Sequence, residues 1–252
     1  MPGFDYRKAA KGIHWDKIQA TEPGGRIKET PETKMLFDIS KSSLDKANKN
    51  LAGAKKDIFD KFANKYGLDT NAYDENGTAR VGAVLKSPES MATRLMRNHF
   101  RGGSIHPNGV RDQIRGIYVF QPNQVNSLND VIKDLQPWMK KLNVVKKPGY
   151  FGLSTNLEYN GTPMEIQFHT PQSWKNHLDT DVIEKKWRGK DKSTFTPQEK
   201  QDYINDMVAI HKLKKKYYAD KDLLAMKDII RNAQKNYDNR NAALYLAGLK
   251  KK

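Results

Sequence analysis

The 252-residue chain carries 45 lysines and arginines against 29 aspartates and glutamates, a formal net charge of +16 at pH 7. It has no cysteine, which excludes a disulfide framework, thiol chemistry and zinc bound by cysteine. No apolar run is long enough to cross a membrane, and we expect neither a membrane partner nor a secretory signal peptide. The positive charge favours polyanionic partners such as nucleotides or RNA, although a solvated lysine-rich helix surface also accounts for part of it.

The beginning of the chain is rich in proline, glycine and charge, and it lacks the periodicity of a helix or a strand. We therefore expect residues 1–37 to form an arm or linker and residues 38–252 to form one domain. A helix is predicted next, because apolar residues recur at seven-residue intervals from Leu44 to Ile58. Gly67 is a suitable C-terminal stop for this helix.

The middle of the chain contains both helical and extended patterns. Residues 67–80 are predicted to be a connection. Ser87 suits the N-cap of a helix that continues to about residue 100, with a proline at its first helical position. Residues 112–121 predict a strand, and residues 127–142 predict a helix that Pro137 breaks or kinks.

Two strands joined by a tight turn are predicted within residues 150–169. Asn160–Gly161 is a strong signal for a type I′ turn, because both central residues must adopt a positive φ. If Tyr159 and Thr162 flank the turn, side chains alternate so that one face of the hairpin is apolar and the other is polar. The polar face carries Tyr150, Ser154, Asn156, Glu165, Gln167 and His169. It is interpreted either as a plain solvated face or as the polar floor of a ligand site.

Helices are predicted for most of the remaining chain. One begins after Thr170, and another begins where Thr196 and Glu199 have the spacing of a capping box. A further helix covers about residues 222–235, within a helical C-terminal extension over residues 197–252. Helices therefore flank a small mixed sheet, and the predicted fold class is α+β.

The helix that follows Ser87 carries candidates for phosphate binding. Free backbone N–H groups at a helix start bind phosphate, and Lys86 and Ser87 lie at this start. Residues three or four positions apart share a helix face. One such face carries Ser90, Arg94, Arg97 and Arg101. This face is interpreted either as a solvated basic surface or as a polyphosphate site.

Asp112 and Glu165 are candidate metal ligands. Asp112 is either a turn residue at a strand start or, if the strand lies beside the hairpin, a neighbour of Glu165. Two nearby carboxylates repel each other unless a cation lies between them, and hard oxygen ligands suit Mg²⁺. Tyr150, which follows Lys146, Lys147 and a glycine, has two interpretations as well. It is either a core tyrosine or an aromatic platform for a purine base, in which case the preceding glycine lets the loop backbone come close to the ligand.

Four segments between about Arg80 and Arg188 resemble the synthetase domain of the RelA/SpoT family. "VLKSPESMATRL" is similar to the family's Arg-x-Lys-x-x-x-Ser motif, and "DQIRGIYV" to its Asp-x-x-Gly-x-Arg strand. "KKPGYFGLST" is similar to its Pro-Lys-x-Asn-Gly-Tyr-x-Ser-Leu-His loop, and "MEIQFHT" resembles Glu-x-Gln-x-Arg-Thr, the most specific match. The resemblance implies a nucleotidyltransferase-like synthetase fold. The chain contains no His-Asp dipeptide, so it resembles a synthetase that lacks the hydrolase domain of longer members.

The resemblance also implies roles for the candidate residues. Asp112 would carry Mg²⁺, Glu165 would activate the acceptor 3′-hydroxyl or share the metal, and Gln167 would orient that site. The residues assigned to ATP and its phosphates are Lys86, Ser87, Ser90, Arg94, Arg97, Arg115 and Lys147. The residues assigned to the acceptor are Tyr150, which would stack on its base, Ser154, Asn156 and His169.

Three positions depart from the family's motifs. Tyr118 and His169 stand where the family has arginine, and Ser154 stands where it has histidine. Because the family's residues at positions 154 and 169 contact acceptor phosphates, these departures allow a nonstandard acceptor.

By this resemblance the chain is an ATP-dependent 3′-pyrophosphokinase that transfers the β,γ-diphosphate of ATP to ADP, ATP, AMP, GDP or GTP. Its products would be of the (p)ppGpp or (p)ppApp type. Without a hydrolase it resembles a growth-inhibiting toxin, expected to act in the bacterial cytoplasm, to be delivered as part of a larger effector, and to have an immunity or antitoxin partner. Two alternatives stay open, namely pyrophosphorylation of the tRNA 3′ end and a non-catalytic RNA-binding role.

Overall fold

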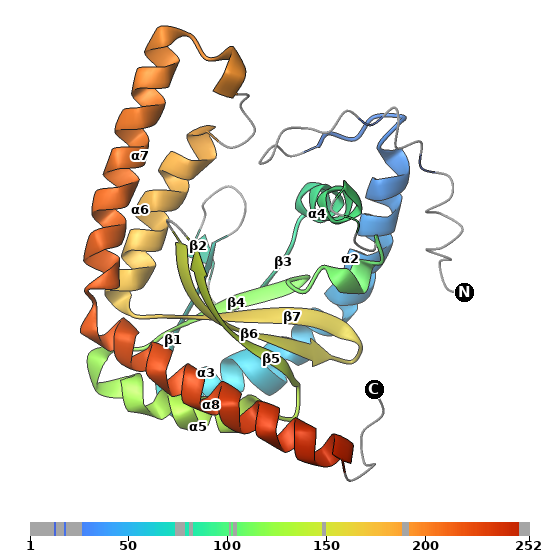
Figure 1. Cartoon of the computed structure of the whole chain (residues 1–252). Coiled ribbons are helices and arrows are strands. Elements are labelled where there is room, and N and C mark those ends of the chain that lie inside the picture. Colours follow the sequence, from blue (N-terminus) through green and yellow to red (C-terminus); the bar gives the residue numbers. More distant parts are fainter. Residues whose placement is uncertain are drawn as a thin grey trace.

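The computed structural model describes residues 13, 18, 27–73, 79–80, 83–100, 102, 105–147, 150–187 and 192–246. These residues form a mixed β-sheet with helices on both sides, so the predicted α+β class is confirmed (Figure 1). Within the same residues, no helix combines the length and the apolar character that a membrane span requires.

The first helical run confirms the predicted helix and its stop. It consists of α2 (Lys34–Ala54), a π-helical turn (Lys55–Asp60) and α3 (Lys61–Tyr66). Its buried side follows the predicted apolar stripe, and the run ends at Gly67, whose φ of 64° lies in the left-handed region that glycine tolerates. The helix begins three residues before the predicted end of the arm.

The sheet has seven strands in the described part of the chain, in the order β2-β1-β4-β7-β6-β5, and β3 also pairs with β4. The strands are β1 (Asp69–Tyr73), β2 (Ala79–Arg80), β3 (Val84–Leu85), β4 (Ile114–Val119), β5 (Met139–Lys147), β6 (Tyr150–Tyr159) and β7 (Thr162–His169). Only β4 and β7 pair in parallel. Because β7, the second strand of the hairpin, also pairs with β4, the sheet brings distant parts of the sequence together.

Two sequence-based predictions about strands were wrong. Residues 67–80, predicted as a connection, contain β1 and β2, and β1 pairs with β4. Residues 139–142, predicted to continue a helix, begin β5 instead. In the second case Pro137 ends α5 (Leu128–Leu135), and pairing with β6 then determines the conformation of the chain.

The hairpin prediction is confirmed. β6 and β7 are antiparallel, Tyr159 pairs with Thr162, and Asn156 pairs with Glu165. At the turn, Asn160 has a φ of 48° and Gly161 a φ of 73°, as a type I′ turn requires.

The other helices agree with the predicted start signals. They are α4 (Pro88–Phe100), α6 (Pro171–Trp187), α7 (Pro197–Tyr218) and α8 (Lys221–Leu246). At the start of α4, the Ser90 backbone N–H donates to Ser87 Oγ at 3.3 Å. At the start of α7, the Thr196 N–H donates to Glu199 Oε2 at 3.0 Å and the Glu199 N–H donates to Thr196 Oγ1 at 3.2 Å, the two bonds of a capping box. α8 extends eleven residues beyond the predicted end.

The two faces of the sheet are covered differently. The largest apolar cluster joins one face to α3, α5 and α8, which lie beneath the sheet in Figure 1. On the opposite face, Trp174 of α6 packs against Ile117 and Val119 of β4. A further cluster joins α2 to α4 and includes Ile27 from the predicted arm. α6 and α4 therefore stand at two sides of the second face of the sheet (Figure 1).

Candidate active site

The second face of the sheet holds two rows of polar side chains. Cross-strand pairing aligns Lys141 of β5, Asn156 of β6, Glu165 of β7 and Arg115 of β4 in one row. Asn143, Ser154 and Gln167 follow in the next row. Because alternate residues of a strand share a face, the predicted polar floor of the hairpin extends onto β4 and β5.

Glu165 is held by two neighbours on this floor. Ser154 Oγ donates to Glu165 Oε1 at 3.2 Å, and Gln167 Nε2 donates to Glu165 Oε2 at 3.0 Å. Burial raises the pKa of the Glu165 carboxyl and the negative charge of Asp112 raises it further, while the hydrogen bonds and the charge of Lys86 oppose the rise. The result is an oriented carboxylate with an elevated pKa, which suits proton transfer.

Asp112 lies just before β4 and forms an ion pair with Lys86, with 2.5 Å between Lys86 Nζ and Asp112 Oδ2. The side chain of Lys86 is only 11% exposed, and that of Asp112 is 28% exposed. Burial would raise the pKa of Asp112, but Lys86, followed by Arg115 and Arg94, holds it below its ordinary value. Asp112 is therefore charged, and its charge raises the pKa of Glu165. That the two carboxylates serve one metal ion stays a prediction.

The cations assigned to ATP phosphates meet around Asp112. Lys86 follows β3, and its backbone N–H donates to the Gln113 carbonyl at 2.9 Å, which extends the pairing with β4. Arg94 comes from α4 and Arg115 from β4, and the charges of both act on Asp112. The β3–α4 segment and β4 thus gather positive charge at one edge of the polar floor.

The predicted roles of the remaining donor residues stay predictions. Ser87 caps α4, Ser90 lies on the same first turn, and Arg97 is half-buried one turn after Arg94. Arg101 and the side chain of Lys147 lie outside the described residues.

The residues assigned to the acceptor are found in different surroundings. Asn156 and Ser154 are buried on the polar floor next to Glu165 and Gln167. His169 is buried where α6 meets the sheet, and its Nδ1 lies 3.0 Å from Ser173 Oγ. The side chain of Tyr150 lies outside the described residues.

Burial, assisted by the neighbouring His177, lowers the pKa of His169 to about 3. Its ring lies 5.2 Å from the Trp174 ring, centroid to centroid. At neutral pH His169 is therefore an uncharged part of the junction between β7 and α6.

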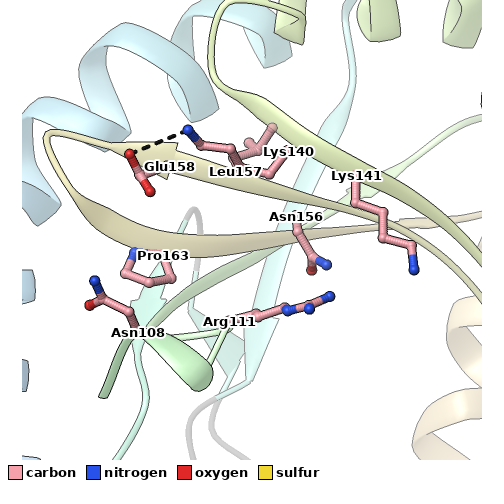
Figure 2. Close-up of a pocket in the computed structure, with 8 residues that line it drawn as sticks. All are labelled: Asn108, Arg111, Lys140, Lys141, Asn156, Leu157, Glu158 and Pro163. Carbon is pink, nitrogen blue, oxygen red and sulfur yellow. Dashed lines mark ion pairs between the residues drawn. The ribbon is translucent and has the colours of Figure 1, made fainter. Parts of the chain in front are cut away.

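A hollow of about 250 Å³ adjoins the floor next to Asn156. Its lining consists of Asn108, Arg111, Lys140, Lys141, Asn156, Leu157, Glu158 and Pro163 (Figure 2). No motif in the sequence indicated Arg111, Lys140 or Lys141 as site residues. Alternation along β5 would have placed Lys141 on the polar face if residues 139–142 had been interpreted as a strand.

The predicted Mg²⁺ site depends on which acidic side chains lie close to one another. The described residues contain no group of three or more His, Asp or Glu side chains that could hold a metal ion. Asp112 and Glu165 are instead two carboxylates whose charges influence each other, beside cations that suit phosphate. Mg²⁺ in phosphate-transfer sites commonly takes one or two carboxylates together with substrate oxygens, so this pair fits Mg²⁺ brought in with a nucleotide.

Comparisons with known proteins gave weak similarities. No family model matches the chain, and no curated protein matches its sequence. The crystal structure of the small alarmone synthetase 1 from Bacillus subtilis is similar at 10% identity and a TM-score of 0.41, over 86% of this chain and 100% of that chain. A GTP pyrophosphokinase family protein from Streptococcus pneumoniae gives 14% identity and a TM-score of 0.37, over 80% and 98%. The same Bacillus subtilis enzyme bound to AMPCPP gives 13% and 0.30, over 75% and 94%.

Proposed function

We propose that the protein is a pyrophosphokinase of the RelA/SpoT type, which transfers the β,γ-diphosphate of ATP to the 3′-hydroxyl of a purine nucleotide. The bond from the acceptor oxygen to the β-phosphorus forms, the bond between the α,β-bridging oxygen and that phosphorus breaks, and AMP leaves. The observation that carries this proposal is the ion pair of Lys86 with Asp112, whose charge acts on Glu165 and is itself influenced by Arg94 and Arg115. Transfer of phosphoryl-type groups depends mainly on positioning and charge neutralisation, which this set supplies.

Glu165 is proposed to accept the proton of the acceptor 3′-hydroxyl. Ser154 and Gln167 each hold one of its oxygens, so the carboxylate is fixed relative to β6 and β7. Its raised pKa makes it a stronger base than an ordinary glutamate. A neighbouring cation from a bound nucleotide would favour the charged, active form of the same group.

Lys86, Arg94 and Arg115 are proposed to bind the ATP phosphates, with Ser87, Ser90, Arg97 and Lys147 as further contacts. Lys86 pairs with Asp112 in the structure described here, and phosphate oxygens would compete for the same ammonium group. Asp112 and Glu165 are the residues that would hold Mg²⁺, which supplies neutralisation of phosphate charge.

On the acceptor side, Asn156 and Ser154 are proposed to contact the sugar or its substituents beside Glu165. Tyr150 is proposed to stack on the purine base, which would accept adenine and guanine alike. A direct contact between His169 and the acceptor is proposed as well. To make it through Nδ1, His169 would have to give up its hydrogen bond with Ser173 Oγ.

Unregulated transfer would consume ATP and acceptor nucleotides, so we propose a growth-inhibiting role as a toxin in the bacterial cytoplasm. Delivery as part of a larger effector and neutralisation by an immunity or antitoxin protein belong to the same proposal. The net charge of +16 supports a second candidate acceptor, the 3′ end of tRNA.

The test is an acceptor panel. Purified protein is incubated with ATP and Mg²⁺ and, in separate reactions, with ADP, AMP, GDP, GTP or tRNA, and AMP release is measured. We expect AMP release that depends on one class of acceptor. AMP release from none of them, together with binding of RNA, would favour the non-catalytic RNA-binding alternative.

A further inference from the structure

A line of hydrogen bonds connects Glu165 with the start of α6. Gln167 Nε2 donates to Glu165 Oε2 at 3.0 Å, and Gln167 Oε1 lies 3.5 Å from His169 Nε2. On the other side of the ring, His169 Nδ1 lies 3.0 Å from Ser173 Oγ. The distance between Gln167 and His169 is at the long limit of a hydrogen bond, and such contacts in active sites often shorten when substrate binds. The buried imidazole of His169 therefore faces the amide of Gln167 with one nitrogen and the first turn of α6 with the other.

The charge of Glu165 determines the direction of these hydrogen bonds. A charged carboxylate only accepts hydrogen bonds, so the amide nitrogen of Gln167 has to face Glu165 and its oxygen has to face the ring. That oxygen is an acceptor as well, so His169 Nε2 must carry the proton of the neutral imidazole. His169 Nδ1 is then an acceptor, and it accepts a hydrogen bond from the Ser173 hydroxyl. Donors thus run in one direction, from the Ser173 hydroxyl to the Glu165 carboxylate.

The start of α6 holds Ser173 in the place that this order requires. The Thr170 N–H donates to Ser173 Oγ at 2.9 Å, and the Ser173 N–H donates to Thr170 Oγ1 at 3.0 Å. Thr170 Oγ1 in turn donates at 2.6 Å to Oδ2 of Asp220, which lies between α7 and α8. The proton of the Ser173 hydroxyl has two acceptors, the Thr170 carbonyl at 3.2 Å and His169 Nδ1 at 3.0 Å. The nearer one is the nitrogen that the order of donors requires.

We propose that His169 and Ser173 are positioning residues, which fix the amide of Gln167 so that it holds the proposed base Glu165 toward the acceptor hydroxyl. This inference rests on the proposed function and adds to it two residues that act without touching a substrate. The arginine of the resembled motif could not take this place, because a guanidinium has only donors and cannot accept the hydrogen bond of Ser173.

Two substitutions at position 169 separate the two nitrogen atoms of the ring. The side-chain amide of His169→Gln reaches as far as Nε2 and can still donate to Gln167, whereas the shorter amide of His169→Asn takes the place of Nδ1 and keeps only the contact with Ser173. We expect kcat to fall about tenfold in His169→Asn and by less than about threefold in His169→Gln, since one hydrogen bond distinguishes them. The KM for ATP should stay within about twofold of the wild type in both.

The ratio between the two variants decides the kinetic test. Equal values of kcat in His169→Asn and His169→Gln, whether lowered or unchanged, would overturn the proposal, since the two differ in the position of the donor. A raised KM for the acceptor with an unchanged kcat overturns it too, and supports a direct contact between His169 and the acceptor.

A second readout is the pKa of the Glu165 carboxyl, which a merely structural role of His169 would not change. The hydrogen bond from Gln167 lowers this pKa against the effect of burial, while the charge of Asp112 raises it and that of Lys86 lowers it. A loosened Gln167 should therefore raise the pKa in His169→Asn and shift the acidic limb of the kcat profile to higher pH. Both should stay unchanged in His169→Gln. An NMR titration of the carboxyl carbon measures this pKa without turnover.

A measurement on the wild type requires neither a variant nor the reaction. The two tautomers of a neutral histidine give different nitrogen chemical shifts, and we expect His169 to carry its proton on Nε2. A proton on Nδ1 overturns the proposal even if the variants lose activity. If no acceptor yields AMP, but His169 is protonated on Nε2 and His169→Asn raises the pKa of Glu165, the positioning by His169 is supported and the proposed reaction is wrong.

Discussion

The two faces of the sheet separate the apolar core from the proposed active site, although the same strands build both. In β7, Met164, Ile166 and Phe168 point into the apolar cluster, and Glu165 and Gln167, which alternate with them, line the polar floor. Successive side chains of a strand point to opposite faces, so an eight-residue strand contributes to both functions. A substitution in β7 should therefore affect stability or activity according to its position in this alternation.

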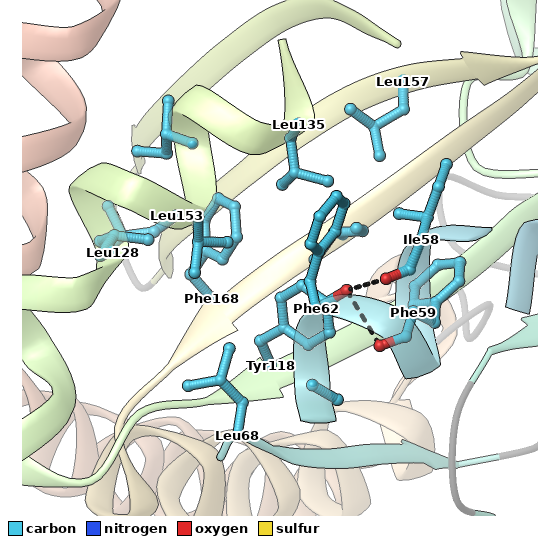
Figure 3. Packing of buried hydrophobic residues seen from close by; sticks show 14 of the residues in the cluster. Ile58, Phe59, Phe62, Leu68, Tyr118, Leu128, Leu135, Leu153, Leu157 and Phe168 are labelled. Carbon is cyan, nitrogen blue, oxygen red and sulfur yellow. Dashed lines mark hydrogen bonds between the residues drawn. The ribbon is translucent and has the colours of Figure 1, made fainter. Parts of the chain in front are cut away.

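Among the described residues, the apolar face packs against helices. Phe168, Leu153 and Leu157 pack with α3 and α5 side chains such as Phe62 and Leu135 (Figure 3). On the polar face, α6 covers the end of β4 through Trp174. The part that carries Glu165 lies between the α4 cations and the hollow, where a substrate has groups of both charges to contact.

The largest expected effect is on the polar face. Glu165→Gln keeps the size and some of the hydrogen bonding of the side chain but removes the base, so turnover should fall by roughly 10²–10⁴-fold. The free energy of unfolding and the affinity for ATP should change little, because the proposed ATP contacts lie on Lys86 and Arg94. Steady-state AMP release, urea unfolding and ATP titration measure the three quantities.

The control for this prediction is Glu29→Gln, which removes an exposed glutamate that pairs with Lys41 far from the floor. In a bacterial cytoplasm, the wild type and Glu29→Gln should arrest growth and Glu165→Gln should not. Growth arrest by a folded Glu165→Gln would indicate toxicity without catalysis, as RNA sequestration would produce.

On the apolar face, Phe168→Ala should mainly affect stability. Phe168 is fully buried and packs edge-to-face on Phe120, with 6.1 Å between ring centroids. Its truncation should lower the free energy of unfolding by about 3–5 kcal/mol, from lost burial and the cavity that remains. Urea unfolding measures this loss, and Phe100→Ala, at a phenylalanine that is 47% exposed, should cost far less. A similar loss in both variants would contradict the division between the faces.

The next prediction concerns whether His169, at the end of the polar face that α6 covers, stabilises the fold. Its pKa of about 3 in the folded protein lies below the value near 6.5 of an unfolded histidine, so the unfolded chain takes up the proton first as the pH falls. The free energy of unfolding therefore keeps its full value, as far as His169 is concerned, above about pH 6.5. As the pH falls toward 3, it decreases by at most about 1.4 kcal/mol per pH unit. His169→Gln should reduce this loss between pH 6.5 and pH 4.5 in urea unfolding. An unchanged slope in His169→Gln would refute the structural role.

Local signals in the sequence predicted the hairpin and the helix starts well. Turn and cap residues act through the backbone next to them, as Asn160–Gly161 and the Thr196–Glu199 pair show. β1 and β2 were missed because pairing makes them strands, β1 with β4 and β2 with β1, rather than a local pattern in the sequence. The hollow was missed because Arg111 and Lys141 come together only in the folded sheet.

The resemblance around β4 leaves the register of the motif ambiguous. Counted back from Gly116, the aspartate of the Asp-x-x-Gly-x-Arg pattern falls on Gln113. Gln113 is buried and structural, since its Oε1 accepts from Ser43 Oγ at 3.0 Å and its Nε2 donates to the Pro107 carbonyl at 3.0 Å. Asp112, one residue earlier, supplies the charge beside Glu165. Only tertiary contacts distinguish these two neighbours.

The smallest expected effect comes from Tyr118, which stands where the resembled motif has arginine. Its ring is fully buried on the apolar face, and its hydroxyl donates to the carbonyl oxygens of Ile58 at 3.1 Å and Phe59 at 3.3 Å (Figure 3). Both carbonyls belong to the π-helical turn between α2 and α3, so this hydroxyl links the turn to the centre of the sheet.

Tyr118→Phe removes only that hydroxyl, and we expect the free energy of unfolding to fall by about 1 kcal/mol, the usual net value of a buried hydrogen bond. Turnover should stay within twofold of the wild type, because the side chain points away from the polar floor. Tyr203→Phe on α7, whose hydroxyl accepts a bond from the exposed Lys192, should change stability by less than half as much. A tenfold loss of turnover in a stable Tyr118→Phe would show that this position acts in catalysis. A residue on the apolar face of β4 would then affect activity, which would contradict the division of roles between the two faces.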